Sequence, residues 1–406
     1  MRIKSCRNCK KTKFINLFSL GKMSFTGRFP KSSKTNIPKE QLNLLMCNFC
    51  KLVQLDRNFN LKYLYGKNYG YRTGINNTMT NHVKQIVKKL SSLVKLKKKD
   101  YVLDIASNDS TLLNFYPNNV IKVGVDPLVN KYIQYYKKIN FKISNFFNLN
   151  DIKKLKLKKK FKIITALSVF YDLRDPNKFI REIKEILDDQ GIIVLEHVDL
   201  HCIIKHKIFD TICHEHLGFF SSKVIIDMVK KNKLKVFAHE YNNVNGGSSR
   251  YYISHIRSKY IIKKSVKKAL INEKKTGIFK KTTYKLFYKR IVDAKLRLIE
   301  KLKSIKSKNL IVHGYGASTK GNVLLQFFNI GKNYIQYIAD RNPLKFNSFT
   351  PGTKIKIISE KKSRTMKPNY YLVLPWHFKK EILGREKKIM NNGTKFIFPL
   401  PKLEIK

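Results

Sequence analysis

"DYVLDIASNDSTLLNFY", residues 100–116, carries the pattern that decides the fold of the central part of the chain. An apolar, strand-like run comes first, a polar turn follows, and an amphipathic stretch closes the segment. Asp104 stands where the strand should end. In doubly wound α/β sheets, ligands bind at the carboxyl ends of the strands, beside the turn into the next helix. The stretch therefore predicts a ligand-binding edge of such a sheet.

The turn and the next strand narrow the choice of ligand. A common form of this motif has three glycines at alternate positions after the acid, and here Ala106, Asn108 and Ser110 take those places. A second acid, Asp126 in "VGVDP", follows about 20 residues later, where a carboxylate commonly holds a ribose diol. Together the two strand ends favour S-adenosylmethionine, as in class I methyltransferases, over a nicotinamide cofactor or a strand without a ligand. The predicted cofactor contacts are Asp104, Ala106, Ser107, Asn108, Asp126 and Ser168.

Strand-like and helix-like segments alternate on both sides of this motif. Between about 83 and 240, short apolar runs such as "GIIVLEHV" are separated by segments with helical spacing such as "FIREIKEIL". This alternation predicts a doubly wound α/β domain. Lys-rich helical patterns follow, and then a second, smaller α/β unit. The expected domains are 1–82 with a Tyr-rich connector, 83–240 with the cofactor site, and 241–406 with connecting helices and a Rossmann-like, substrate-binding unit.

Two cysteine pairs stand near the beginning of the chain. Cys6 and Cys9 form one CxxC, Cys47 and Cys50 form another, and 37 residues lie between the two pairs. Each CxxC can form a tight turn that supplies two thiolates, and four thiolates make a closed tetrahedral zinc site. This predicts a Zn²⁺ ion that holds a small domain together and takes no part in chemistry; four unrelated buried thiols are the alternative.

The formal net charge of +57 raises the question of nucleic acid binding. Only 14 of the 84 basic residues are arginines, whereas base readout and bidentate phosphate contacts favour arginine. The lysines are scattered over every segment, which favours a drift of composition over a dedicated polyanion-binding surface. We expect no nucleic acid partner, although the charge favours acidic small substrates.

The chain also lacks the usual marks of a membrane protein. No apolar run approaches the roughly 18 to 20 residues that span a bilayer, and the first residues resemble no signal peptide. We expect a cytoplasmic protein with no membrane partner.

"DTICHEHLGFF", residues 210–220, places His214, Glu215 and His216 in consecutive positions. On an extended strand the two histidines would point to one side and the glutamate to the other. A histidine beside a carboxylate is the usual arrangement of a general base. A metal site would need further ligands that are not evident nearby, and a polar surface loop is an equal alternative.

A glycine-rich turn, "HGYGASTKGN" at 313–322, follows a predicted strand of the C-terminal unit. Its spacing is not that of a P-loop. Backbone N–H groups and Lys320 could still hold a phosphate. A plain strand-to-helix turn is an equal alternative.

Taken in order, these motifs resemble those of the nucleotide-sugar C-methyltransferases that make branched deoxysugars. The matching segments include "IASNDSTLL", "SVFYDLRDP", "DTICHEHLGFFS", "NVNGGSSRYYISH", "GYGASTKGN" and "RNPLKFNSFTPGTKI", and they extend over nearly the whole chain. The resemblance implies a zinc-binding domain, a methyltransferase domain that binds S-adenosylmethionine, and a C-terminal Rossmann-like domain. It also implies that a keto sugar loses a proton next to its carbonyl and that the resulting enolate attacks the methyl group.

The resemblance assigns roles to particular residues. His216 corresponds to the family's base, with Glu215 orienting or tuning it and His214 lining the same pocket. The diphosphate of the substrate needs cations, for which Arg250 and Lys320 are the candidates. The residues that correspond to the family's sugar-nucleotide site are Tyr69, Tyr71, Asn245, Gly246, Gly247, Arg250, Lys320 and Asn322.

Two departures from the family affect the choice of substrate. Cys213 stands where the family often has tyrosine, and "FYD" at 170–172 stands where it often has a histidine. The acceptor could therefore differ from the usual keto sugar, and methylation of a sugar hydroxyl or of nucleic acid are alternatives. A non-catalytic assembly protein that retains the fold is a further alternative. The sequence leaves the sugar, the nucleotide and the oligomeric state open.

Overall fold

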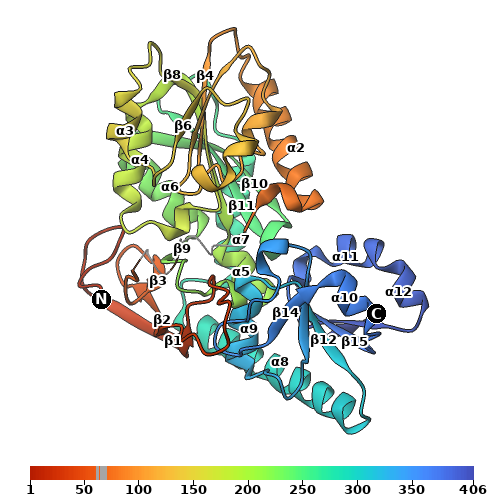
Figure 1. Cartoon of the computed structure of the whole chain (residues 1–406). Helices are drawn as coiled ribbons and strands as arrows, with labels where there is room; N and C mark the ends of the chain where they lie inside the picture. Colours follow the sequence, from red (N-terminus) through yellow and green to blue (C-terminus); the bar gives the residue numbers. More distant parts are fainter. Residues whose placement is uncertain (61–63, 65–70) are drawn as a thin grey trace.

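The computed structural model describes residues 1–60, 64 and 71–406. The described residues form three β-sheets (Figure 1). Within the described ranges, no helix is long and apolar enough to cross a membrane.

The N-terminal domain is built on a four-stranded antiparallel sheet in the order β1-β2-β3-β9. Three of its strands come from the first 55 residues, whereas β9 comes from the central part of the chain and pairs with β3. The strands are β1 (Phe14–Ser24), β2 (Lys39–Cys47), β3 (Val53–Leu55) and β9 (Gly218–Phe219). The sequence does not predict this insertion, because a two-residue strand has no periodicity of its own.

The central domain has a seven-stranded sheet in the order β10-β11-β8-β7-β4-β5-β6. Neighbouring strands from β8 to β6 are parallel, and β11 runs antiparallel to β8 and β10. The strands are β4 (Tyr101–Ile105), β5 (Ile121–Val125), β6 (Phe141–Ile143), β7 (Phe161–Leu167), β8 (Leu187–Val198), β10 (Leu234–Asn242) and β11 (Ser248–His255). The helices are α2 (Asn77–Leu93), α3 (Leu149–Lys154), α4 (Pro176–Glu185), α5 (Leu200–His206) and α6 (Ser222–Lys231). The predicted doubly wound α/β fold is confirmed.

In helix α2 the apolar spacing of the sequence corresponds to the buried face of the helix. Its buried residues, among them Val83, Ile86 and Leu90, recur at spacings of three and four and pack against the sheet. The helix begins earlier than the apolar pattern because the side chain of Asn76 accepts a hydrogen bond from the N–H of Met79 and caps its first turn.

The central sheet continues beyond the expected domain boundary at residue 240. Strand β11 lies between β8 and β10, so the chain leaves this sheet only after His255. The reason is the reversed strand: β10 reaches the edge of the sheet first, and β11 then returns antiparallel to fill the gap beside β8.

The C-terminal domain contains a six-stranded sheet in the order β14-β13-β12-β15-β16-β17, parallel except for β17. Two long helices, α7 (Lys264–Thr276) and α8 (Lys281–Ser307), lead into it. The strands are β12 (Val312–Tyr315), β13 (Tyr337–Asp340), β14 (Lys356–Ser359), β15 (Tyr370–Val373), β16 (Lys395–Phe398) and β17 (Glu404–Ile405). The remaining helices are α9 (Thr319–Phe328), α10 (Glu360–Thr365), α11 (Lys379–Arg385) and α12 (Lys387–Asn391).

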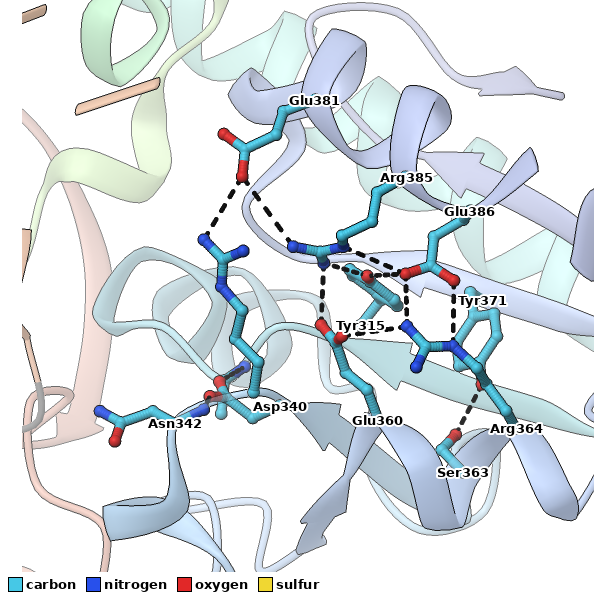
Figure 2. A network of polar contacts seen from close by, with 12 residues as sticks. Tyr315, Asp340, Asn342, Glu360, Ser363, Arg364, Tyr371, Glu381, Arg385 and Glu386 are labelled. Atoms are coloured by element: carbon cyan, nitrogen blue, oxygen red, sulfur yellow. Dashed lines mark hydrogen bonds and ion pairs between the residues drawn. The ribbon is translucent and has the colours of Figure 1, made fainter. Parts of the chain in front are cut away.

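A network of charged side chains connects α10 and α11 above the end of β12 (Figure 2). Glu386, only 2 % exposed, accepts a hydrogen bond from the Tyr315 hydroxyl at 2.7 Å and two from Arg364 at 2.6 and 3.1 Å. Glu360 accepts from both Arg364 and Arg385. Because these carboxylates and guanidinium groups satisfy one another, we interpret the network as a structural element of the domain.

Candidate active site

A cavity of about 500 Å³ lies where the three domains meet, and all three contribute to its lining. Two hydrogen bonds join the N-terminal and C-terminal domains: Asn322 donates to the carbonyl of Thr26 at 2.7 Å, and the N–H of Ser24 donates to Gln326 at 2.8 Å. The predicted site residues that line the cavity are Tyr71, Asp104, Ala106, Ser107, Asn108, Asp126, Ser168, Glu215, His216, Asn245 and Lys320. Residues far apart in the sequence thus share one cavity of the size of a small-molecule site.

The turn after β4 has the backbone shape that a glycine-rich turn would adopt. Ala106, Asn108 and Ser110 have φ angles of 61°, 51° and 59°, in the left-handed region at the three alternate positions. For residues with a side chain this conformation costs about 1–2 kcal/mol each. The turn therefore keeps the conformation of a glycine-rich turn although it contains no glycine. A turn that keeps a strained backbone in this way is typical of a ligand-binding site.

Asp126 follows β5 and closes this turn from the other side. Its carboxylate accepts from the N–H of Asn108 at 2.9 Å and from the N–H of Leu128 at 2.7 Å. Burial raises the pKa of Asp126 by more than these two hydrogen bonds lower it, so the pKa is raised overall. Each carboxylate oxygen can accept a further hydrogen bond, and Asp126 lines the cavity, which suits a ribose diol.

Asp104, at the end of β4, lies deeper. Thr165 donates to it at 2.6 Å, and burial raises the pKa of Asp104 to about 7. Ser107 contacts the hydroxyl of Tyr136 at 2.8 Å, and Ser168 has a left-handed φ of 56° after β7. The predicted cofactor residues thus line one end of the cavity, at the carboxyl ends of β4, β5 and β7, and these residues fit S-adenosylmethionine.

Loss of the Asp126 carboxylate tests this assignment. We expect Asp126→Ala to weaken S-adenosylmethionine binding by about 1–3 kcal/mol, because the ribose loses hydrogen bonds to a charged acceptor. Titration calorimetry measures the difference. Asp227→Ala on the exposed face of α6 is the matched control and should bind as the wild type does. Unchanged affinity in Asp126→Ala would contradict the assignment.

The stretch around His216 is a turn and not an extended strand. The N–H of His216 donates to the carbonyl of Cys213 at 3.2 Å, which folds the chain back between them. The expectation that His214 and His216 point the same way is therefore wrong. His214 packs between Phe25 and Phe59 of the N-terminal domain, outside the cavity lining, and burial lowers its pKa to about 4.

His216 faces the cavity in a defined tautomer. Its Nδ1 lies 2.6 Å from the carbonyl oxygen of Thr211, which can only accept, so Nδ1 carries the proton. Nε2 is then the basic nitrogen. Burial lowers the pKa of His216 to about 3, and the positive charge of Lys320 acts in the same direction. The imidazole is neutral at pH 7, with the free lone pair on Nε2.

Glu215 does not orient His216, contrary to the prediction. Its carboxylate accepts from the hydroxyl of Thr26 at 3.3 Å and lines the cavity, while Thr211 holds the imidazole. Burial raises the pKa of Glu215. The sequence did not predict the role of Thr211 because its backbone carbonyl, and not its side chain, accepts the hydrogen bond from His216. The available signal was its position, five residues before His216.

Lys320 contributes a cation to the same cavity. Its Nζ donates to the carbonyl of Asn245 at 2.7 Å and lies 3.7 Å from the carboxylate of Asp210. Asp210 is fully buried and also accepts from the indole N–H of Trp376 at 2.8 Å. Burial lowers the pKa of Lys320, and Asp210 partly offsets this.

Gly246 and Gly247 shape the turn that presents the Asn245 carbonyl. Their φ angles are +92° and +146°, and a Cβ atom at Gly247 would lie 2.6 Å from the Cβ of Cys202. Only glycine fits this turn without displacing its neighbours. The predicted Gly-Gly turn therefore acts on the cavity through Asn245 and Lys320.

Three other predicted substrate residues have different positions. Arg250 lies outside the cavity lining and pairs with Glu196 at 2.8 Å and with Glu240 at 3.2 Å. Asn322 is buried behind the lining, on the carbonyl of Thr26. Tyr69 lies outside the described residues.

Sequence reasoning also missed a buried acid–base pair at the cofactor end of the cavity. His82 of α2 lies 2.6 Å from Glu196 at the end of β8, and Asn242 also donates to that glutamate. Burial raises the pKa of Glu196, but His82 and Arg250 outweigh it and the pKa is lowered. His82 belongs to a helix whose polar positions carry no motif, so the sequence offered no signal for this contact.

The four predicted zinc ligands come together in the N-terminal domain. The sulfur atoms of Cys6, Cys9, Cys47 and Cys50 all lie within 4.8 Å of one another. Two sulfur pairs are 3.5 Å apart, close to the roughly 3.8 Å that tetrahedral Zn–S bonds of about 2.3 Å require. After each CxxC, Lys10 and Lys51 have left-handed φ angles that complete the two tight turns. The residues fit a zinc ion.

The fold and the strand-end site together define an S-adenosylmethionine-dependent methyltransferase with a zinc-binding N-terminal domain. Sequence comparison agrees. Three family models match in succession: a zinc binding domain over residues 6–65, a methyltransferase domain over residues 76–239, and a C-methyltransferase C-terminal domain over residues 243–401. The chain therefore matches, in order, the zinc binding, methyltransferase and C-methyltransferase C-terminal domains that these models describe.

The chain is also similar to individual methyltransferases. The C-methyltransferase NovU of Streptomyces niveus is 25 % identical over 407 residues, covering 98 % of this chain and 96 % of the relative. Among solved structures, an S-adenosylmethionine-dependent methyltransferase from Clostridium acetobutylicum is 12 % identical, with a TM-score of 0.35, and covers 43 % of this chain and 90 % of its own. Magnesium protoporphyrin IX methyltransferase from Synechocystis, with bound SAH, is 12 % identical, with a TM-score of 0.33, and covers 44 % and 88 %. Likenesses of this size carry no information on the substrate.

Proposed function

We propose that the protein methylates a carbon atom next to the carbonyl of a nucleotide-linked keto sugar, with His216 as the general base. The observation that carries the proposal is the tautomer of His216: Thr211 holds the proton on Nδ1 and leaves Nε2 basic at the cavity. The full-length similarity to a relative named as a C-methyltransferase supports transfer to carbon.

In this proposal the chain's own residues prepare the carbon nucleophile. Nε2 of His216 takes the proton from the carbon beside the carbonyl, and the electron pair of the broken C–H bond moves toward the carbonyl oxygen. The cofactor supplies a methyl group that is already activated on a positively charged sulfur. The enolate carbon would then bond to that methyl group as the methyl–sulfur bond breaks and its electron pair stays on the sulfur, which becomes neutral. His216 later releases its proton to solvent.

Lys320 suits the negative charge that develops on the carbonyl oxygen. A buried ammonium group, held by Asn245 and Asp210, acts in surroundings with little water, where its field is strong. His214, which was expected to line the same pocket, packs outside the cavity lining and is not available to this charge. Lys345, which also lines the cavity, is available to the diphosphate.

Isotope exchange in the wild-type protein tests the reaction. With an unreactive cofactor analogue bound, the enzyme should exchange the sugar proton beside the carbonyl for deuterium, followed by mass spectrometry over a panel of nucleotide sugars. A matched incubation with S-adenosylmethionine should give a product heavier by one methyl group. Methyl transfer without exchange on any keto sugar would indicate a hydroxyl acceptor and contradict the proposal.

A further inference from the structure

We propose that Arg7, which lies between two zinc ligands, is a positioning residue for His216. The part of this inference that concerns turnover rests on the proposed function. Its structural part rests on β9, the strand that begins two residues after His216 and completes the sheet of the zinc-binding domain.

Arg7 connects the zinc site to β3. Its side chain is 4 % exposed, and its guanidinium donates to the carbonyls of Leu55 at 2.7 Å and of Arg57 at 2.8 Å, and to side-chain oxygens of Gln54 and Asn58. An arginine guanidinium is charged at pH 7.

The charge of the zinc site accounts for a buried arginine at this point. Four thiolates around one Zn²⁺ carry a net negative charge, and an arginine within the first CxxC compensates it. Gln54 strengthens the connection, because its Nε2 donates to the Cys6 sulfur at 3.3 Å while its Oε1 accepts from the N–H of Arg7 at 3.1 Å. The bonds of Arg7 and Gln54 therefore fix β3 relative to the zinc site.

Strand β3 in turn holds the chain next to His216. Val53 pairs with Phe219 and Gln54 with Gly218, and the N–H of Leu55 donates to the carbonyl of Leu217 at 3.0 Å. The residue that accepts this bond is the direct neighbour of His216.

Leu217 is also held from the central domain. Its N–H donates to the carbonyl of Tyr171 at 2.8 Å, and the ring of Tyr171 packs on the imidazole of His216 with centroids 4.0 Å apart. Thr211 sets the tautomer of His216, whereas Leu55 and Tyr171 set its place in the cavity. Loss of the bond from Leu55 should displace the base without changing its chemistry.

The test compares Arg7→Met with Arg2→Met, a control in the same domain whose side chain is 78 % exposed. Amide hydrogen exchange should increase in the peptides that contain Leu55 and Leu217 and stay unchanged in β4 and β5. Turnover should fall about tenfold or more with KM within about twofold, since small displacements of a reacting group are costly. Zinc content and S-adenosylmethionine affinity should match the wild type.

Two outcomes would overturn the proposal: unchanged amide exchange at Leu55, or full turnover despite increased exchange. If Arg7→Met does not fold, Arg7→Lys replaces it, because lysine keeps the charge but cannot span the same oxygens. It should show the same changes in milder form. The amide-exchange result does not depend on the sugar or on the identity of the base, so failure of the proposed function would leave that part of the test intact.

Discussion

Replacement of His216 by alanine should lower turnover at least about a hundredfold, the usual contribution of a positioned acid–base group. S-adenosylmethionine affinity should be unchanged, because the residues assigned to the cofactor lie at the ends of β4, β5 and β7. Deuterium exchange of the sugar proton should fall in parallel with methyl transfer. His255→Ala at the end of β11 is the control and should retain both activities.

The pH dependence gives a second measure of the same residue. A pKa lowered to about 3 keeps the imidazole neutral from pH 8 to pH 5, so with the cofactor analogue saturating at every pH the exchange rate should not fall over that range. An unperturbed histidine would lose its basic form below about pH 6.5. A half-loss of exchange near that value, or equal exchange in His216→Ala and wild type, would contradict the assignment of a buried neutral base.

The features that the sequence predicted correctly depend on local patterns. Alternating apolar and helical spacings predicted the central α/β domain, since each strand and helix carries its own periodicity. Ala106, Asn108 and Ser110 were recognised as standing in the places of the motif's three glycines, and the structure shows a left-handed conformation at all three. The cysteine spacing predicted the zinc site because two turns supply all four ligands.

The features that the sequence did not predict depend on contacts between distant segments. The rule that alternate residues share a face failed at His214 and His216 because a hydrogen-bonded turn replaces the strand there. The pairing of β9 with β3 joins segments more than 160 residues apart, and neither is long enough to show a pattern. Asp210 stood in the same stretch as His216, but its partner Lys320 belongs to another domain.

Lys320→Met should lower kcat about a hundredfold to a thousandfold, the usual effect of removing one group that stabilises an oxyanion. KM should change no more than severalfold, because the charge on the oxygen develops only in the transition state. Deuterium exchange should fall with kcat. Lys345→Met is the matched control: its ammonium lines the same cavity and donates to the carbonyl of Ala317 at 2.6 Å, and its loss should raise KM more than it lowers kcat.

The substitution also leaves the buried carboxylate of Asp210 without its cation, which could reduce stability for a reason unrelated to catalysis. The double variant Lys320→Met with Asp210→Asn removes both charges and keeps an acceptor for the Trp376 indole. It should melt closer to the wild type than Lys320→Met does and remain as inactive. A raised KM at unchanged kcat in both variants would instead assign Lys320 to the diphosphate of the substrate, and the oxyanion would then need another donor.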